Sequence, residues 1–160
     1  MCYKDIREKV KRIKNQYESC NPLTIIKELN IVPAFFAQDI ADELPDGCYF
    51  KSEGIAFILI DSTLNEHERN ITYAHELGHA ILHPDVDTLT LEKYNKNLVQ
   101  KYENEANIFA AELLLDDNIC HNYQGYSAHE IAKSEYVSVE LVRYKYNSLY
   151  KSNFTFKNYA

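Results

Sequence analysis

The segment Ile71–Pro84, ITYAHELGHAILHP, places three histidines and a glutamate in an apolar pattern that predicts a helix facing the core. His75, Glu76 and His79 fit the spacing HExxH. Because residues four positions apart lie on one face of a helix, both imidazoles can reach the same metal ion. Glu76 lies close enough to contact a water on that metal without being a ligand. The metal would lower the pKa of the water to about 7, and Glu76 would accept its proton as a general base.

The histidines also allow an interpretation without a metal, in which His75 and His79 are satisfied core histidines and Glu76 lies at the edge of their helical face. Gly78 favours the metal, because it lets another backbone or a substrate approach this face closely. His83 continues the spacing of four but lies about 12 Å along the helix axis from His75, so we expect a second-shell or surface role for it. The remaining histidines are expected on the surface: His67, His121 and His129.

A catalytic zinc usually takes three protein ligands, so a third ligand is expected outside this motif. The extended motif HExxHxxGxxH is excluded, because Leu82 and Asp85 stand where it needs glycine and histidine. The next helix, predicted over residues 102–115, offers three glutamates instead: Glu103, Glu105 and Glu112.

Helical geometry favours Glu103 among these glutamates. Glu103 shares a small, apolar face with Asn107, whereas Glu105 and Glu112 point to the opposite side and are expected in solvent. Asn107 follows one turn later, where it could hydrogen-bond a zinc-bound imidazole as a second-shell residue. The alternative is that Glu103 is an exposed first-turn glutamate favoured by the helix dipole. Two aspartates are weaker candidates for the third ligand: Asp85 and Asp87.

The rest of the chain predicts an α+β domain around these two helices. Apolar residues at helical spacing predict helices over 3–18, 21–30, 62–83, 102–115, 127–136 and 138–150. Runs rich in β-formers within 31–36 and 48–61 predict a small antiparallel sheet packed against the mainly helical part, and 85–100 is ambiguous. We expect a single domain over 1–160, with a core over about 20–117, C-terminal helices over about 126–150 and a tail over 151–160.

The composition argues against several classes of protein. The net charge is −7, whereas a protein that grips nucleic acid needs a surplus of lysine and arginine, so direct nucleic-acid binding is not expected. The charged N-terminal segment lacks the apolar stretch of a signal peptide, and no apolar run approaches the ~20 residues of a membrane span. Four isolated cysteines without a CxxC pair are typical of a reducing cytoplasm.

The motifs YAHELGHAILH (residues 73–83) and ENEANIFAAELLL (residues 103–115) together resemble the ImmA/IrrE family of zinc metallopeptidases. The similarity covers the order of elements over about residues 20–145. It implies a zincin-like fold, zinc bound by His75, His79 and Glu103, and Glu76 as the base. It also implies a protein substrate, namely a helix-turn-helix repressor of a phage or mobile element.

The resemblance to the family is less clear in two parts of the chain. Members of the family usually continue the second motif with Met-Pro, whereas this chain has Asp116 and Asp117, so the adjacent wall of the substrate groove is in doubt. The segment SEYVSVELVRYKYNSL is similar to a family segment that resembles part of a helix-turn-helix module, with a plain pair of packing helices as the alternative. No oxyanion-stabilising residue is assigned by spacing, although tyrosines offer candidates: Tyr94, Tyr102 and Tyr123.

The leading hypothesis is therefore a zinc-dependent endopeptidase. The alternative is a non-enzymatic module of the same fold that acts as an antirepressor by sequestering its partner, with zinc structural or absent. A DNA-binding regulator is a third reading, which depends on the C-terminal helices alone and which the acidic balance disfavours.

Overall fold

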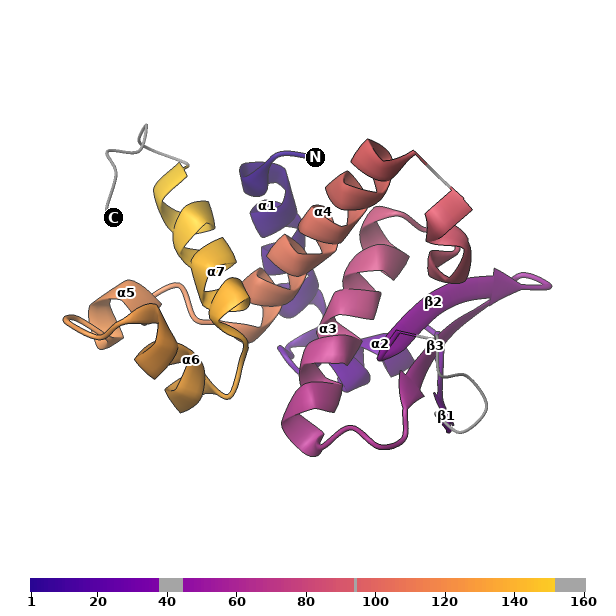
Figure 1. Ribbon diagram of the computed structural model, residues 1–160, viewed down its shortest axis with the longest axis horizontal. Helices are drawn as coiled ribbons and strands as arrows, with labels where there is room; N and C mark the ends of the chain where they lie inside the picture. The colour runs from indigo at the N-terminus through magenta and orange to yellow at the C-terminus, as the bar shows by residue number, and fades with distance from the viewer. Residues whose placement is uncertain (38–44, 94, 152–160) are drawn as a thin grey trace.

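The chain has an α+β fold in which the histidine helix, α3, lies between a small sheet and a group of other helices (Figure 1). The structure, a computed structural model, describes residues 1–37, 45–93 and 95–151. Its helices are α1 Tyr3–Tyr17, α2 Pro22–Glu28, α3 Glu66–Leu82, the 3-10 helix η2 Thr88–Lys93, α4 Lys96–Leu114, α5 Ile119–Asn122, α6 Ala128–Glu135 and α7 Val139–Lys151. Its strands are β1 Val32–Phe36, β2 Gly47–Ser52 and β3 Ile55–Asp61. Within these ranges, no helix combines the length and apolar character needed to cross a bilayer.

The predicted helices and strands all have counterparts, which confirms the α+β class and the small sheet beside a mainly helical part. The short α5 was not predicted, and α4 begins six residues earlier than residue 102, after the N-cap Asn95. Most of the tail predicted over 151–160 lies outside the described residues.

The sheet has the strand order β1-β3-β2 and is mixed, so the predicted antiparallel pairing is wrong for one of its two ladders. β2 and β3 form an antiparallel hairpin, whose turn residues Glu53 and Gly54 both have positive φ. β1 pairs with the other side of β3 and runs parallel to it. β2 runs antiparallel to both β1 and β3. Because β3 lies in the middle of the sheet, it also neighbours β1, which runs in the same direction as β3.

The histidine helix begins where its capping residues dictate. Asn65 is the N-cap, because its side-chain oxygen accepts hydrogen bonds from the backbone N–H groups of His67 and Glu68. Glu68 completes a capping box by accepting from the backbone N–H of Asn65 at 2.9 Å. The helix ends at Leu82, two residues before Pro84, and this start and end place the HExxH motif in its second half.

The helix α4 is packed on several sides, by α3, α1 and α7 (Figure 1). The prediction that Glu105 and Glu112 face solvent is therefore wrong, since they are 5% and 3% exposed. Glu105 pairs with the N-terminal ammonium group of Met1 and with His83, while Glu112 pairs with Lys145 of α7. A helical wheel assumes one buried face, and that assumption fails for a helix enclosed by three others.

Gly78 brings α3 and α4 into close contact. A Cβ atom at this position would lie 3.1 Å from both Cα and the carbonyl oxygen of Ala106, and 3.2 Å from Cβ of Phe109. Two of these atoms belong to the backbone of α4, which cannot rotate out of the way. Glycine at this position therefore sets the distance between the two helices that carry the candidate metal ligands.

The substitution Gly78→Ala is expected to destabilise the protein by about 1–2 kcal/mol. Overpacking a filled interface costs about 1–3 kcal/mol, and the better helix propensity of alanine recovers up to about 1 kcal/mol. Denaturant unfolding of the metal-free protein measures this difference. An unchanged or higher stability would mean that α4 shifts freely to make room.

Candidate metal centre

The structure brings together His75, His79 and Glu103, the three residues predicted as ligands. α3 supplies the two histidines one turn apart, and α4 supplies the glutamate from the facing helix. Nε2 of His75 lies 3.1 Å from Nε2 of His79 and 3.2 Å from Oε2 of Glu103. Nε2 of His79 lies 3.5 Å from Oε1 of Glu103. Among the described residues, this is the group of three whose ligand atoms all lie within 4.8 Å of one another.

These distances fit a tetrahedral zinc ion. Zinc binds nitrogen and oxygen ligands at about 2.1 Å, so two ligands of a tetrahedral ion are about 3.4 Å apart. The three measured separations, 3.1, 3.2 and 3.5 Å, fall close to that value. Two imidazoles with one carboxylate are a donor set that zinc uses in catalytic sites, where a fourth position stays open.

The local electrostatics favour a cation between these side chains. Burial alone would raise the pKa of Glu103, but hydrogen bonds from His75 and His79 outweigh burial and hold that pKa well below its ordinary value. Burial would lower the pKa of His75, and the hydrogen bond to Glu103 reverses this and raises it. Glu103 is therefore an ionised carboxylate, the form that a metal ion requires.

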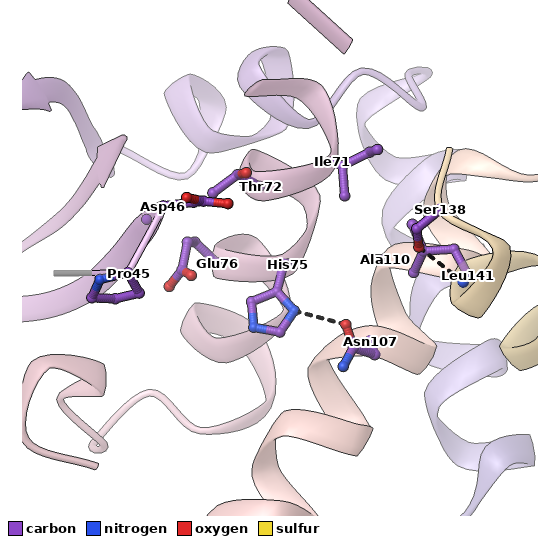
Figure 2. Close-up of a pocket in the computed structure, with 11 residues that line it drawn as sticks. Pro45, Asp46, Ile71, Thr72, His75, Glu76, Asn107, Ala110, Ser138 and Leu141 are labelled. Carbon is purple, nitrogen blue, oxygen red and sulfur yellow. Dashed lines mark hydrogen bonds between the residues drawn. The ribbon is translucent and has the colours of Figure 1, made fainter. Parts of the chain in front are cut away.

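Asn107 lies where the sequence predicts it, beside the first histidine. Its Oδ1 is 3.1 Å from Nδ1 of His75, the ring nitrogen that faces away from the other ligands (Figure 2). His83 is placed differently: its Nε2 lies 3.3 Å from Oε2 of Glu105, and its ring packs on that of Tyr102. The ring of His83 also lies alongside the ring of His79, with 5.9 Å between ring centroids, and its Nε2 has no hydrogen-bond partner among the described residues.

Glu76 is buried beside the histidines and faces a cavity of about 260 Å³ (Figure 2). Among the residues that the structure describes, none hydrogen-bonds its Oε2, and burial raises the pKa of its carboxyl group against the opposing charges of His75 and His79. The cavity is lined by residues from the start of β2, from α3, from α4 and from the start of α7: Pro45, Asp46, Gly47, Ile71, Thr72, His75, Glu76, Asn107, Ala110, Ser138 and Leu141. The arrangement places a carboxylate of raised pKa next to a three-ligand site, at the wall of a cavity that can admit another molecule.

Gly47, at the start of β2, allows the sheet to approach Glu76. A Cβ atom on Gly47 would lie 2.4 Å from Cγ2 of Thr72 and 3.2 Å from Cγ of Glu76. The sequence does not single out Gly47 or the cavity wall from α7, with Ser138 and Leu141, because no local pattern says which segment returns to cover the site.

The other candidates named from sequence lie outside the cluster. Asp85 is an exposed residue paired with Lys51, and Asp87 accepts a hydrogen bond from the backbone of Leu89. Among the tyrosines considered as oxyanion stabilisers, Tyr102 packs on His83 and Tyr123 donates to Glu135. Tyr94 lies outside the described residues.

Comparison with known proteins agrees with this geometry. A peptidase family described as the IrrE N-terminal-like domain matches residues 34–147. The chain is 34% identical over 147 residues to uncharacterized immunity region protein 2 of Bacillus phage phi105, a match that covers 89% of this chain and 90% of the relative. It is 36% identical over 78 residues to metallopeptidase ImmA of Bacillus subtilis (strain 168), with 46% of each protein covered.

The family match spans most of the chain, and it includes α3, α4 and the start of α7. Together with the group formed by His75, His79 and Glu103, it supports a metallopeptidase role. On this evidence the chain belongs to the ImmA/IrrE family, the peptidases with an IrrE N-terminal-like domain.

Proposed function

We propose that this protein is a zinc-dependent endopeptidase. The observation that carries the proposal is the convergence of His75, His79 and Glu103 from two helices, at separations that suit one tetrahedral ion. In this assignment those three residues hold the zinc. Asn107 orients His75, and Glu76 is the catalytic carboxylate.

When bound, the zinc supplies Lewis-acid activation of a water molecule and of the scissile carbonyl group. Glu76 accepts the proton that this water loses and delivers it to the nitrogen of the leaving amine. Its raised pKa suits both steps, since a general base that must later act as an acid works best when its pKa is near the ambient pH. Within the described part of the chain Oε2 has no hydrogen-bond partner, which suits an atom that takes the proton.

The proposed substrate is a protein, namely a helix-turn-helix repressor of a phage or mobile element, cleaved in the cytoplasm. A phage immunity-region protein and a metallopeptidase ImmA are among the relatives, which supports a substrate involved in phage or mobile-element regulation. The net charge of −7 suits such a partner, because a DNA-binding repressor carries basic surface that an acidic protein attracts.

The direct test is to incubate the zinc-loaded protein with a candidate helix-turn-helix repressor and to analyse the fragments by mass spectrometry. We expect one or a few defined cleavage sites, and a chelator should abolish cleavage. An intact repressor that nevertheless binds the protein and loses its operator affinity would instead support sequestration.

The substitution Glu103→Ala should raise the dissociation constant for zinc by at least about tenfold. Losing an outer contact to a ligand already costs about 10–100-fold, and this substitution removes a ligand itself. Competition with a chromophoric chelator measures the constant. Glu105→Gln is the control, because Glu105 lies two positions away on α4 and pairs with His83. Equal zinc affinities for the Glu103→Ala variant and the wild type would remove Glu103 from the site.

A further inference from the structure

The backbone of Tyr49 in β2 is hydrogen-bonded to a side chain from the connection between α3 and α4. Its N–H donates to Oγ1 of Thr88 at 2.7 Å, and the Thr88 hydroxyl donates to the carbonyl oxygen of Tyr49 at 3.0 Å. A residue of an antiparallel strand makes the same two bonds, because the residues of a hydrogen-bonded pair exchange both. The Thr88 hydroxyl therefore stands where the backbone of another strand would pair with β2.

The edge of β2 that Thr88 occupies is the outer edge of the sheet. The strand order is β1-β3-β2, so in the described part of the chain the only strand that pairs with β2 is β3. Because the backbone groups of successive strand residues point to alternate sides, Gly47 and Lys51 share the outer edge with Tyr49. Gly47 lines the cavity together with Glu76. A chain that leaves the cavity along β2 therefore meets Thr88 two residues further on.

Residues 84–90, which we call the strap, lie along this edge. The 3-10 helix η2, which begins at Thr88, packs against β2 (Figure 1). The hydroxyl group of Tyr49 donates to the carbonyl oxygen of Pro84 at 2.9 Å. Nζ of Lys51 lies 3.7 Å from Oδ1 of Asp85, but the side chain of Asp85 is 95% exposed, and such a pair contributes little. The attachment of the strap to β2 thus depends mainly on the hydrogen bonds of Tyr49.

We propose that the strap keeps the outer edge of β2 closed in the free protein, and that an extended segment of the protein substrate pairs with this edge once Thr88 has left it. The closure rests on the endopeptidase function proposed above and adds a conformational step before substrate binding. A peptide that adds to the edge of a sheet gains its affinity from main-chain hydrogen bonds, and here it would replace both bonds between Thr88 and Tyr49.

The burial of Tyr49 makes this exchange of partners necessary. Tyr49 is 1% exposed, and a buried backbone N–H or carbonyl group without a partner is costly. Either the strap or the substrate must therefore satisfy these groups. The apparent affinity for the substrate is reduced to the fraction of molecules whose edge is open, so weakening the strap should strengthen substrate binding.

The test is the substitution Thr88→Val, which keeps the shape of the side chain and removes the hydroxyl group. A hydrogen bond contributes a net factor of about two to ten at equilibrium. We expect KM for cleavage of a candidate helix-turn-helix repressor to fall about two- to tenfold, with kcat unchanged. Thr90→Val is the matched control in the same 3-10 helix, because the hydroxyl of Thr90 donates to the carbonyl oxygen of Asp87 within the strap. It should leave KM unchanged.

Hydrogen exchange of the Tyr49 amide, followed by NMR, reports on the edge directly. In the metal-free protein without substrate, Thr88→Val should speed this exchange about two- to tenfold. The amides of Cys48 and Phe50, which face β3, should keep their rates. In the double variant Thr88→Val/Glu76→Gln, which holds the repressor without cleaving it, adding the repressor should slow the exchange of Tyr49 again.

Three results would overturn the role of the strap: an unchanged or higher KM in Thr88→Val, an equal fall of KM in Thr90→Val, or a Tyr49 amide that stays unprotected when the repressor binds. Failure of the proposed function looks different, because neither wild type nor any variant would then cleave or bind the repressor. The exchange rate of Tyr49 in the substrate-free protein would still decide whether Thr88 holds the edge closed.

Discussion

The substitution Glu76→Gln should lower the rate of substrate cleavage by about 10²–10⁴-fold, the usual contribution of a general acid–base group. Glutamine keeps the size of the side chain but cannot accept the proton of the attacking water. Zinc affinity should stay unchanged, because the candidate ligands are His75, His79 and Glu103. Single-turnover cleavage of the repressor and zinc titration of the same preparations measure both quantities.

The same substitution should not destabilise the metal-free protein at neutral pH. Glu76 is 4% exposed, and its Oε2 has no hydrogen-bond partner in residues 1–37, 45–93 and 95–151, so its charge is held in a site that disfavours it. Its pKa in the folded protein is raised above the unfolded value, so its stabilising contribution is present below the unfolded pKa and is lost as the pH rises through the folded pKa. Thermal melting at about pH 7 should therefore give Glu76→Gln a melting temperature equal to or above that of wild type.

Three outcomes would contradict the assignment of Glu76. Cleavage at the wild-type rate by Glu76→Gln would remove Glu76 from the reaction. If this variant fully relieved repression without cleaving the repressor, sequestration of the repressor would be favoured. A large loss of zinc affinity would place Glu76 among the ligands instead. Glu68→Gln is a suitable control, because Glu68 lies on the same helix in an exposed capping box and is not among the residues that line the cavity.

The parts of the site that the sequence predicts are those governed by local helical geometry. His75 and His79 share a helical face because they are four residues apart, and the structure places their Nε2 atoms 3.1 Å apart. Glu103 was selected because it rises from a small, apolar face, and Asn107 because it follows one turn later. Both inferences needed only the period of one helix and the assumption that α3 packs on that face.

The parts that the sequence does not predict depend on contacts between distant segments. Glu105 and Glu112 were expected in solvent, but α1 and α7 cover the sides of α4 on which they lie. The parallel pairing of β1 follows from strand order, which alternating patterns do not encode.

The substitution Lys145→Ala should lower the free energy of unfolding by about 3–5 kcal/mol, the usual cost of removing one partner from a buried ion pair. Lys145 is 0% exposed and donates to Oε2 of Glu112 at 2.7 Å and to Oδ1 of Asp117 at 2.6 Å. Without it, Glu112 stays buried, and its Oε1 has no hydrogen-bond partner among the described residues. Its Oε2 keeps a distant ion pair with Nε of Arg7, at 3.9 Å. Denaturant unfolding measures the loss, and Lys133→Ala, at an exposed lysine of α6, should change stability by less than about 0.5 kcal/mol.

The origin of this loss is the unpaired charge, so removing both partners should cost less than removing one. The double variant Lys145→Met/Glu112→Leu should recover much of the stability lost in Lys145→Ala, because an apolar pair of similar volume leaves no buried charge.

The pH dependence of stability gives a second check on the charge of Lys145. Burial raises the pKa of Asp117, but hydrogen bonds from Lys145 and Arg7 outweigh burial and leave that pKa below its ordinary value of 3.8. The stability that Asp117 contributes is therefore present above its unfolded pKa and is lost as the pH falls through its folded pKa, and Lys145→Ala should flatten that acid loss. Equal losses in the single and double variants would show instead that the aliphatic stem of Lys145, rather than its charge, holds α7 against α4.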